Sequence, residues 1–343
     1  MDLKSTKNDQ QIEEKINELV REYGGDPEEF DCELVKQMVK TSLRFIKDNH
    51  NTAQLKLVNR ALKELRYAYR IFNKHPGEKR LSIFGSSRTP EDHQDYITAR
   101  NFSAEMAKKN WMCITGAADG IMKAGHEGSS AEASFGLSIR LASFETSSNE
   151  LIEGDPKNIS FKYFFTRKLM FMSHSEAIAV LPGGVGTMDE LFEILTLLQM
   201  GKSQIIPVVL LEGEGGVYWK YWLTYVKKNL LANGWISEED LNFFHIAKDV
   251  KDGVEHVNRF YSRYHSSRFV GKQFVIRMHS PLTEDQVSLL NEKYQILLQE
   301  GKFVQGKALK GEEDALELPR ISFHFKRRHY GTLRALIDQI NAF

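Results

Sequence analysis

The pattern of hydrophobic and polar positions changes twice along the chain and predicts three parts. Residues 1–77 carry apolar side chains at helical spacing, which indicates a helical segment that either caps the core or forms an arm through which copies of the chain associate. Over residues 78–265, short apolar runs of strand length alternate with longer stretches of helical periodicity. In residues 266–343, stretches in which apolar and polar residues alternate, as in strands, occur together with two stretches of helical spacing. This pattern predicts a small α+β domain at the carboxyl end.

The middle part has the alternation that predicts a Rossmann-like α/β fold, a doubly wound parallel sheet with helices on both faces. In such a sheet, ligands bind beyond the carboxyl ends of the strands. The strands expected here are 81–84, 112–115, 136–143, 177–181 and 205–211, and the helices are 96–109, 120–133, 161–173, one from about residue 187, 217–231 and 250–264. In the last part, strands are expected at 274–278 and 321–325, and helices at 283–300 and 331–341.

Glycine-bearing loops follow three of the expected strands. Gly85, Ser86 and Ser87 follow the first strand, residues 116–120 follow the second, and residues 182–190 follow the fourth. Because the carboxyl ends of parallel strands meet at one edge of the sheet, these three loops are expected to converge on a single ligand site.

The third loop has the features of a phosphate site. Its glycines permit a tight turn off the strand, and Gly186 and Thr187 open a helix whose first N–H groups lack partners. Those donors and the positive end of the helix dipole suit a phosphate, although a tight turn without a ligand is the alternative. The chain has no Walker motif and no Gly-x-Gly-x-x-Gly after its first strand, so a mononucleotide is expected rather than a nicotinamide dinucleotide.

Glu190 lies three residues beyond Thr187 and has two interpretations. In a capping box, the two side chains would satisfy each other's backbone amides and carry no chemistry. In a functional site, the carboxylate would lie beside the sugar of a bound nucleotide. There it would hold ribose hydroxyls, activate water or stabilise positive charge that develops on the sugar.

Composition narrows the class of protein. Lys+Arg and Asp+Glu both number 46, so the chain lacks the positive charge of a general nucleic-acid binder. The only cysteines are Cys32 and Cys113, too few and too far apart for a disulfide framework or a cysteine zinc site. No apolar run is long enough to span a membrane and the first residues are polar, so a cytoplasmic protein without a membrane partner is expected. No metal site is expected, because partners at the spacing of metal ligands are missing around His126, His174 and His265.

Two basic clusters lie in or near the last part, at residues 263–268 and 327–329. They are expected to form a solvated face, with a site for an anionic effector as the alternative.

The sequence FFTRKLM at residues 164–170, followed by PGGVGTMDE at residues 182–190, resembles the LOG family. The resemblance covers residues 80–264 and points to a longer bacterial branch. It implies a hydrolase that cleaves nucleoside 5'-monophosphates, AMP for example, to free base and ribose 5-phosphate. It further implies that no metal or organic cofactor is needed and that the chain forms a homo-oligomer, a dimer or larger. Some members were formerly labelled lysine decarboxylases.

Residue by residue, the resemblance places the catalytic pair of the family on Arg167 and Glu190. Lys168, beside Arg167 on the same helix, is expected to face elsewhere. The implied phosphate contacts are Gly85, Ser86, Ser87, Gly184, Val185, Gly186 and Thr187, and the implied base and ribose pocket contains Gly116, Asp119, Gly120 and Met122.

Two departures from the family pattern bear on the substrate. Ala117, Ala118 and Asp119 stand where a run of glycines is common, and their side chains would narrow or recharge the base pocket. Residues 163–166 replace a Met-His pair typical of the plant members, so a specialised cytokinin substrate is not expected.

Two other functions fit parts of the sequence. A nucleotide-sensing module that binds without turnover would need the phosphate loop but not both Arg167 and Glu190. A pyridoxal-phosphate lysine decarboxylase would need a lysine for the Schiff base, and the sequence has no recognisable segment for it.

Overall fold

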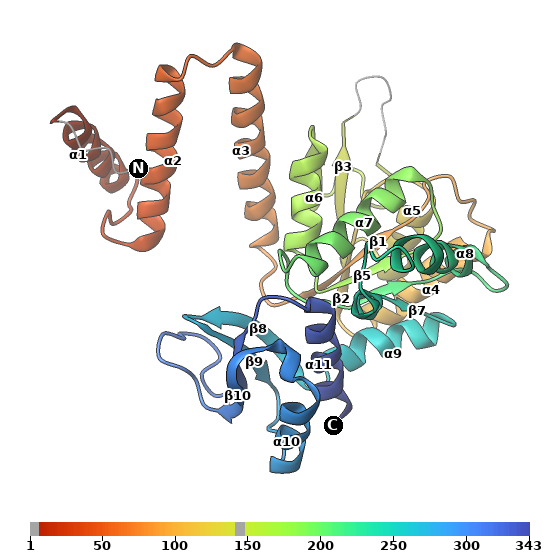
Figure 1. Cartoon of the computed structure of the whole chain (residues 1–343). Helices are drawn as coiled ribbons and strands as arrows, with labels where there is room; N and C mark the ends of the chain where they lie inside the picture. The colour runs from red at the N-terminus through yellow and green to blue at the C-terminus, as the bar shows by residue number, and fades with distance from the viewer. Residues whose placement is uncertain (1–6, 141–147) are drawn as a thin grey trace. The chain divides into compact units, whose positions relative to one another are not determined.

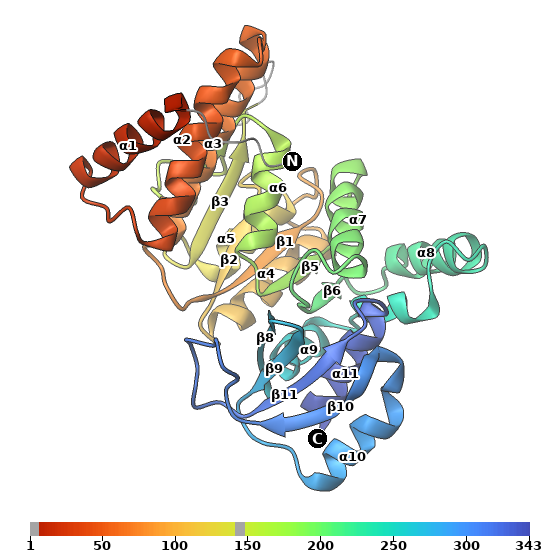
Figure 2. The ribbon, with the colours of Figure 1, turned by 60° about the vertical axis from the view of Figure 1, so that its left-hand side comes forward.

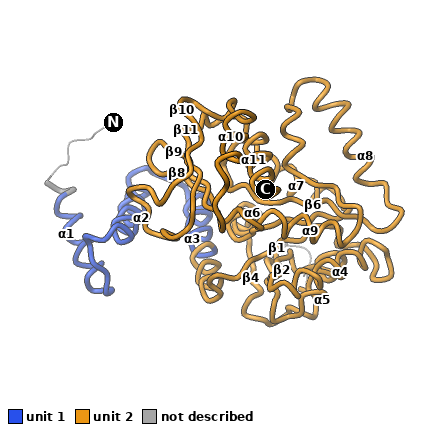
Figure 3. Tube along the Cα trace, turned by 90° about the horizontal axis from the view of Figure 1, so that it is seen from below, with its two compact units in different colours: residues 1–64 blue, residues 65–343 orange. Residues whose placement is uncertain are grey.

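The computed structural model describes residues 7–140 and 148–343. The chain divides into two compact units, residues 1–64 and residues 65–343, which Figure 3 shows in different colours. The boundary falls inside one helix, α3 (Thr52–Phe72). The last turns of α3 belong to the second unit, where Ala68, Ile71 and Phe72 are buried in its core.

The first unit is helical, as the sequence predicts. It contains α1 (Lys7–Glu22), α2 (Phe30–Lys47) and the first part of α3. An ion pair of 2.7 Å between Lys40 and Glu13 links α2 to α1. Several apolar side chains of these helices are exposed, among them Phe30, Leu34, Met38, Ile46 and Leu62.

A parallel sheet of seven strands forms the centre of the second unit, in the order β4-β3-β2-β1-β5-β6-β7. Figure 2 labels β3, β2, β1, β5 and β6 of this sheet. The strand order runs from β1 outward in both directions, so the switch point of the topology lies between β1 and β5. The strands are β1 (Lys79–Phe84), β2 (Trp111–Thr115), β3 (Ser134–Ile139), β4 (Asn158–Phe161), β5 (Ala177–Val180), β6 (Val208–Leu210) and β7 (His245–Ile246).

Helices cover both faces of this sheet, which confirms the doubly wound Rossmann-like fold (Figure 1). The strands are apolar on both sides, so successive residues point into two different cores. Leu81 and Ile83 of β1 pack with α4, α5 and α9, whereas Phe84 packs with α6, α7 and α8. The helices are α4 (Gln94–Ala107), α5 (Ile121–Ser129), α6 (Phe164–Ser173), α7 (Val185–Gln199), α8 (Tyr218–Tyr225) with a π-helical continuation (Val226–Leu231), a 3₁₀ helix (Glu238–Phe243) and α9 (Val250–Phe260).

The last part of the chain forms a four-stranded antiparallel sheet with two helices, in the order β10-β11-β9-β8. It belongs to the same compact unit as the parallel sheet. The side chain of Arg334 is buried and donates to the carbonyl of Ile206 at 3.1 Å, which ties α11 to the Rossmann-like part. The elements are β8 (Tyr264–Val270), β9 (Gln273–Met278), α10 (Glu284–Lys293), a 3₁₀ turn (Gln295–Leu297), β10 (Leu298–Gly306), β11 (Arg320–Phe325) and α11 (Tyr330–Ala342).

Several predicted boundaries are wrong because residues with helical spacing in the sequence lie in or beside paired strands in the structure. The helix expected at 161–173 begins at Phe164, since β4 takes the preceding residues and pairs with β3. The helix expected at 250–264 ends at Phe260 before β8, and the one expected at 283–300 ends at Lys293 before β10 pairs with β11. The strand expected at 136–143 ends at Ile139, and residues 141–143 lie outside the described part.

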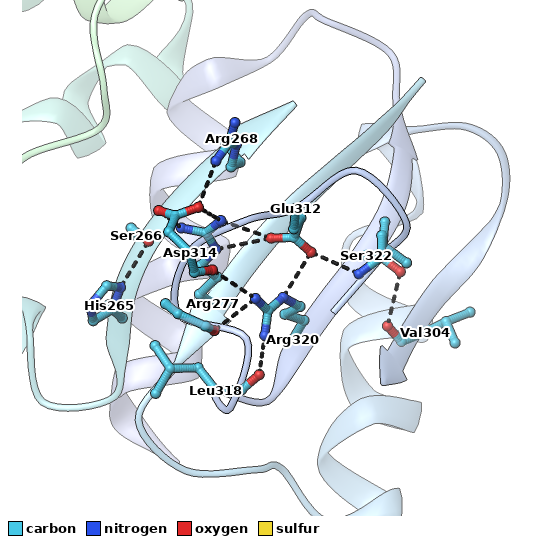
Figure 4. Close-up of polar contacts among 12 residues, drawn as sticks. His265, Ser266, Arg268, Arg277, Val304, Glu312, Asp314, Leu318, Arg320 and Ser322 are labelled. Atoms are coloured by element: carbon cyan, nitrogen blue, oxygen red, sulfur yellow. Dashed lines mark hydrogen bonds and ion pairs between the residues drawn. The ribbon is translucent and has the colours of Figure 1, made fainter. Parts of the chain in front are cut away.

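A buried ion-pair network holds the polar loop between β10 and β11 against the small sheet (Figure 4). The carboxylate of Glu312 is fully buried and lies 2.8 Å from Arg277 and 2.9 Å from Arg320. Asp314 extends the network toward solvent and contacts Arg277 and Arg268, each at 2.8 Å. Burial raises the pKa of Glu312, but hydrogen bonds from the Leu309 amide and the two arginines outweigh it and leave that pKa lowered.

Across the described ranges 7–140 and 148–343, every helix is too short or too polar to cross a lipid bilayer.

Candidate functional site

A cavity of about 690 Å³ opens at the carboxyl edge of the parallel sheet, beside the switch point. All three predicted loops contribute to its wall, so the sequence-based expectation of one shared site agrees with the geometry. Its lining includes Phe84, Gly85, Ser86, Ser87, Arg88, Gly116, Ala117, Ala118, Met122, Ser138, Ile139, Ser148, Phe164, Arg167, Phe171, Gly184, Val185, Gly186, Thr187, Asp189 and Glu190.

Hydrogen bonds between backbone groups join the three loops. The amide of Ser86 donates to the carbonyl of Pro182 at 3.2 Å, and the amide of Ile121 donates to the carbonyl of Ser86 at 3.0 Å. Gly183 is required at the junction, because an added Cβ would lie 2.1 Å from the Thr187 hydroxyl oxygen. The loops therefore form one connected rim rather than three independent turns.

The amino end of α7 lies at this cavity. Gly184 is the N-cap of the helix, and the first intrahelical bond runs from the Met188 amide to the Gly184 carbonyl at 3.1 Å. The amides of Val185, Gly186 and Thr187 therefore precede the intrahelical ladder, and all three residues line the cavity. Backbone donors at the positive end of a helix are suited to an anion.

The position of Thr187 excludes the capping-box interpretation of Glu190. Thr187 is the third residue of α7 and not its N-cap, and the N-cap Gly184 has no side chain to offer. Glu190 lies one turn further along α7, on the wall of the cavity, and is only 8% exposed.

Arg167 and Glu190 face each other across the cavity wall. The guanidinium nitrogen Nη2 of Arg167 lies 3.9 Å from the carboxylate oxygen Oε1 of Glu190, and both side chains are largely buried. The guanidinium also lies over the ring of Phe164, 4.9 Å from its centre. The Nε of Arg167 is buried with no hydrogen-bond partner among the described residues.

Burial perturbs both charged groups. It raises the pKa of Glu190, and the nearby charges of Lys168 and Arg167 oppose that rise. Burial lowers the pKa of Arg167, while the carboxylates of Glu190 and Asp189 oppose that change. A guanidinium stays protonated in proteins, so Arg167 keeps its charge.

The prediction that Lys168 faces away from the site is wrong. Its ammonium group lies 2.8 Å from Asp189, 2.5 Å from Glu193 and 3.4 Å from Oε2 of Glu190. Burial lowers the pKa of Lys168, but the hydrogen bonds with Asp189 and Glu193 outweigh it and leave that pKa raised. Because α6 and α7 pack side by side, adjacent residues of α6 reach the same carboxylate from two directions.

The residues expected in the base and ribose pocket separate into two groups. Gly116 and Met122 line the cavity. Asp119 is exposed and lies outside the lining, so its carboxylate does not recharge the pocket as the sequence suggested. Gly120 is buried behind the lining, where an added Cβ would lie 2.4 Å from the carbonyl oxygen of Ser86.

Several lining residues escape the sequence-based interpretation. Arg88 follows the first glycine loop directly, and this position is a signal that could have identified it. Phe164 and Phe171 lie one helical turn to either side of Arg167 on α6, so helical spacing also points to them. Ser148 follows the end of β3 at a distance and has no local motif that would mark it.

Within residues 7–140 and 148–343, no three His, Cys, Asp or Glu side chains gather in an arrangement that could hold a metal ion.

The fold and the cavity define a Rossmann-like α/β protein with a polar site at the switch point of its sheet. The family model described as "Possible lysine decarboxylase" matches residues 114–257. The chain is 33% identical over 94 residues to the cytokinin riboside 5'-monophosphate phosphoribohydrolase LOG5 of Arabidopsis thaliana, a match that covers 27% of this chain and 40% of that protein. It thus spans less than half of the length of this plant relative.

A bacterial relative matches over a longer stretch. The cytokinin riboside 5'-monophosphate phosphoribohydrolase of Mycobacterium tuberculosis is 28% identical over 160 residues, which cover 46% of this chain and 81% of that protein. These matches confirm the predicted resemblance to the LOG family.

Solved structures align with about half of this chain at low similarity. A molybdenum cofactor carrier protein from Chlamydomonas reinhardtii aligns with a TM-score of 0.35 and 17% identity over 53% of this chain and 97% of its own. The protein TM1055 aligns with a TM-score of 0.36 and 19% identity over 53% of this chain and 99% of its own. At these scores, the likeness says nothing about function.

Proposed function

We propose that this chain hydrolyses the N-glycosidic bond of nucleoside 5'-monophosphates to give the free base and ribose 5-phosphate. The observation that carries the proposal is the pair Arg167 and Glu190, 3.9 Å apart, on the wall of a cavity that also contains the free amides at the start of α7. One pocket thus combines backbone donors suited to an anion with a buried carboxylate and a guanidinium. The names of the relatives describe the same class of reaction.

The 5'-phosphate would bind at the start of α7. The amides of Val185, Gly186 and Thr187 supply backbone donors there, and Ser86 and Ser87 line the same cavity. Backbone donors fixed by a helix bind an anion without reorganisation, so the phosphate would anchor the nucleotide in one orientation.

Arg167 and Glu190 would then act on the sugar. The guanidinium offers a planar set of donors to ribose or phosphate oxygens. The carboxylate of Glu190 would stabilise the positive charge that develops on the ribose as the bond to the base lengthens. Its second task would be to orient the attacking water.

The reaction balances with water alone. The water oxygen forms a bond to C1' as the bond between C1' and the base nitrogen breaks, and the electron pair of that bond stays on the base. One proton of the water ends on the base nitrogen, and the remaining hydroxyl stays on C1' of ribose 5-phosphate. As in glycoside hydrolysis, positive charge develops on the sugar as the bond to C1' breaks.

A decarboxylase of the pyridoxal-phosphate type has less support. That chemistry needs a lysine amine at the cofactor, and none of the described lining residues is a lysine. Lys168, beside Arg167, is not a lining residue and forms ion pairs with Asp189, Glu190 and Glu193.

We also propose that copies of the chain associate. Exposed apolar side chains lie on α6 and α7 near the cavity, including Phe165, Leu169 and Phe192. Light scattering on the purified protein tests this, and a monomer across a wide concentration range would contradict it.

The proposed activity is tested by incubating the purified chain with a panel of nucleoside monophosphates that includes AMP and cytokinin nucleotides. Release of free base together with equimolar ribose 5-phosphate supports the proposal, and the panel sets the substrate range. Tight nucleotide binding with no product from any substrate would instead indicate a sensor.

A further inference from the structure

The cavity wall formed by Ala117 and Ala118 is held from behind by a buried polar network. Three side chains make up this network, Thr115 at the end of β2, Asn149 after β3, and His126 on α5. Thr115 and His126 are fully buried and Asn149 is 3% exposed. None of the three lines the cavity, and the described contacts of the site do not otherwise use them.

Ala117 adopts a backbone conformation that needs support. Its φ is +64°, in the left-handed region that residues with a Cβ rarely occupy, and its side chain is buried. The amide of Ala117 donates to the hydroxyl oxygen of Thr115 at 3.0 Å, and the amide of Asn149 donates to the carbonyl of Ala117 at 2.8 Å. Both sides of the unusual residue are therefore fixed by a neighbour.

The side chain of Asn149 fixes the next peptide as well. Its Nδ2 lies 3.1 Å from the carbonyl oxygen of Ala117 and 3.0 Å from that of Ala118. Since carbonyl oxygens only accept hydrogen bonds, the amide must present its NH₂ group to the loop. One side chain thus grips two consecutive carbonyls of the cavity wall.

His126 sets the orientation of both partners. Its Nε2 lies 3.2 Å from the carbonyl oxygen of Phe135, which only accepts, so Nε2 carries the proton and also faces the Thr115 hydroxyl at 2.9 Å. The other ring nitrogen, Nδ1, is then an acceptor that lies 3.2 Å from Asn149 Nδ2 and shares the two N–H donors of that amide with the loop carbonyls. Burial lowers the pKa of His126, in agreement with a neutral ring.

We propose that Thr115, His126 and Asn149 act as one set of positioning residues that presets the Ala117 and Ala118 wall for the sugar and base of the substrate. The inference rests on the proposed function. A preset wall removes the cost of ordering the loop when the substrate binds, so loss of the network acts on KM.

A matched pair at one position tests the inference. Thr115→Val keeps the size of the side chain but removes the acceptor for the Ala117 amide, whereas Thr115→Ser keeps that acceptor and removes only a methyl group. We expect Thr115→Val to raise the KM for AMP about 10-fold, with Thr115→Ser within about 2-fold of the parent chain. The pH profile of kcat/KM should keep its shape, since Arg167, Lys168 and Glu190 are untouched.

Asn149→Asp provides a second variant in case Thr115→Val does not fold. It replaces the NH₂ group that grips the two carbonyls by an oxygen, and the same rise in KM is expected. The double variant should raise KM by less than the product of the two single increases, because both substitutions act through one loop. Circular dichroism and thermal unfolding confirm that each protein compared is folded.

The outcomes separate this inference from the proposed function. A parent chain that cleaves AMP, with KM raised in Thr115→Val and Asn149→Asp but not in Thr115→Ser, supports the positioning role. A parent chain that cleaves AMP, with folded variants of unchanged KM, overturns the positioning role alone. A parent chain that neither binds nor cleaves any nucleoside monophosphate overturns the proposed function and the inference with it.

Discussion

The ammonium group of Lys168 lies 3.4 Å from the carboxylate oxygen Oε2 of Glu190, a residue of the cavity wall. The lysine therefore contacts the group on which the proposed chemistry depends without lining the pocket itself. Its positive charge opposes the effect of burial on the pKa of Glu190 and keeps the carboxylate ionised over a wider pH range.

Removal of this charge should shift the pH dependence of the reaction. In Lys168→Met, burial acts on Glu190 with one opposing charge fewer, so the pKa of Glu190 rises further above its ordinary value. If ionised Glu190 is the active form, kcat/KM falls as the pH drops through this pKa, and the acid limb of the profile moves to higher pH. Lys168→Arg keeps the charge and should leave the limb near its original position. Coincident acid limbs in all three proteins would contradict this role for Lys168.

The 5'-phosphate should be essential for efficient turnover. The amides of residues 185–187 form charge-assisted hydrogen bonds only when an anion is present. Loss of two such bonds corresponds to a fall of roughly 10²-fold or more in kcat/KM for adenosine relative to AMP. The measurement is release of adenine from both substrates, with inorganic phosphate tested as a competitive inhibitor. Similar rates for adenosine and AMP would rule out the phosphate anchor at α7.

The network around Glu312 should control the stability of the small antiparallel sheet. Glu312→Gln leaves the buried guanidinium groups of Arg277 and Arg320 without their shared carboxylate, at a cost of about 3–5 kcal/mol in the free energy of unfolding. Asp314→Asn is the matched control, since that side chain is 63% exposed and its loss costs about 1 kcal/mol or less. Urea unfolding measures the free energy of unfolding of both variants. Equal losses in Glu312→Gln and Asp314→Asn would contradict the stabilising role of Glu312.

The pH dependence of this contribution has a definite sign. The folded-state pKa of Glu312 is lowered, so its stabilisation is fully present above the pKa of the unfolded chain. That stabilisation is lost as the pH falls through the lowered pKa of the folded state. The difference in stability between the parent chain and Glu312→Gln should therefore shrink in acid.

The sequence predicted five strands of the parallel sheet and the three glycine loops because they depend on local signals, whereas it missed β4 and β7 at the edges of the sheet. Apolar runs mark buried strands, and glycines after a strand mark the turn at its carboxyl end. Arg167 and Glu190 came from the motif that resembles the LOG family, and the structure brings them within 3.9 Å of each other. The capping-box alternative depended on where α7 begins, and that boundary is among the least reliable features of a sequence.

The remaining features depend on contacts between distant segments. Lys168 contacts Glu190 because α6 and α7 pack together, and no pattern within either helix records that packing. The network of Thr115, His126 and Asn149 joins three separate elements, and the sequence offered only a histidine without metal-like spacing. β10 escaped prediction because its pairing with β11 decides its conformation.

The last part of the chain is less separable than its change of pattern suggests. The side chain of Asn341 in α11 accepts hydrogen bonds from the amides of Arg263 and Tyr264, and Arg334 is buried against the Rossmann-like part. Truncation after Tyr264 would remove both sets of contacts. We therefore expect the shortened chain to unfold at lower temperature than the full chain, by a margin that thermal unfolding will measure.

In the proposed reaction, Glu190 acts in catalysis through its negative charge. Glu190→Gln keeps the size of the side chain and removes the charge, while the backbone amides that would hold the phosphate are unaltered. Turnover of AMP should fall by about 10²–10³-fold, as expected on loss of one preorganised electrostatic group.

The most direct measurement compares turnover and nucleotide binding in the parent chain and Glu190→Gln. We expect Glu190→Gln to lose turnover and to retain its affinity for AMP, measured by calorimetry on the folded variant. Normal turnover by Glu190→Gln would contradict this expectation and would leave Arg167 and the start of α7 as a binding site whose chemistry, if any, lies elsewhere.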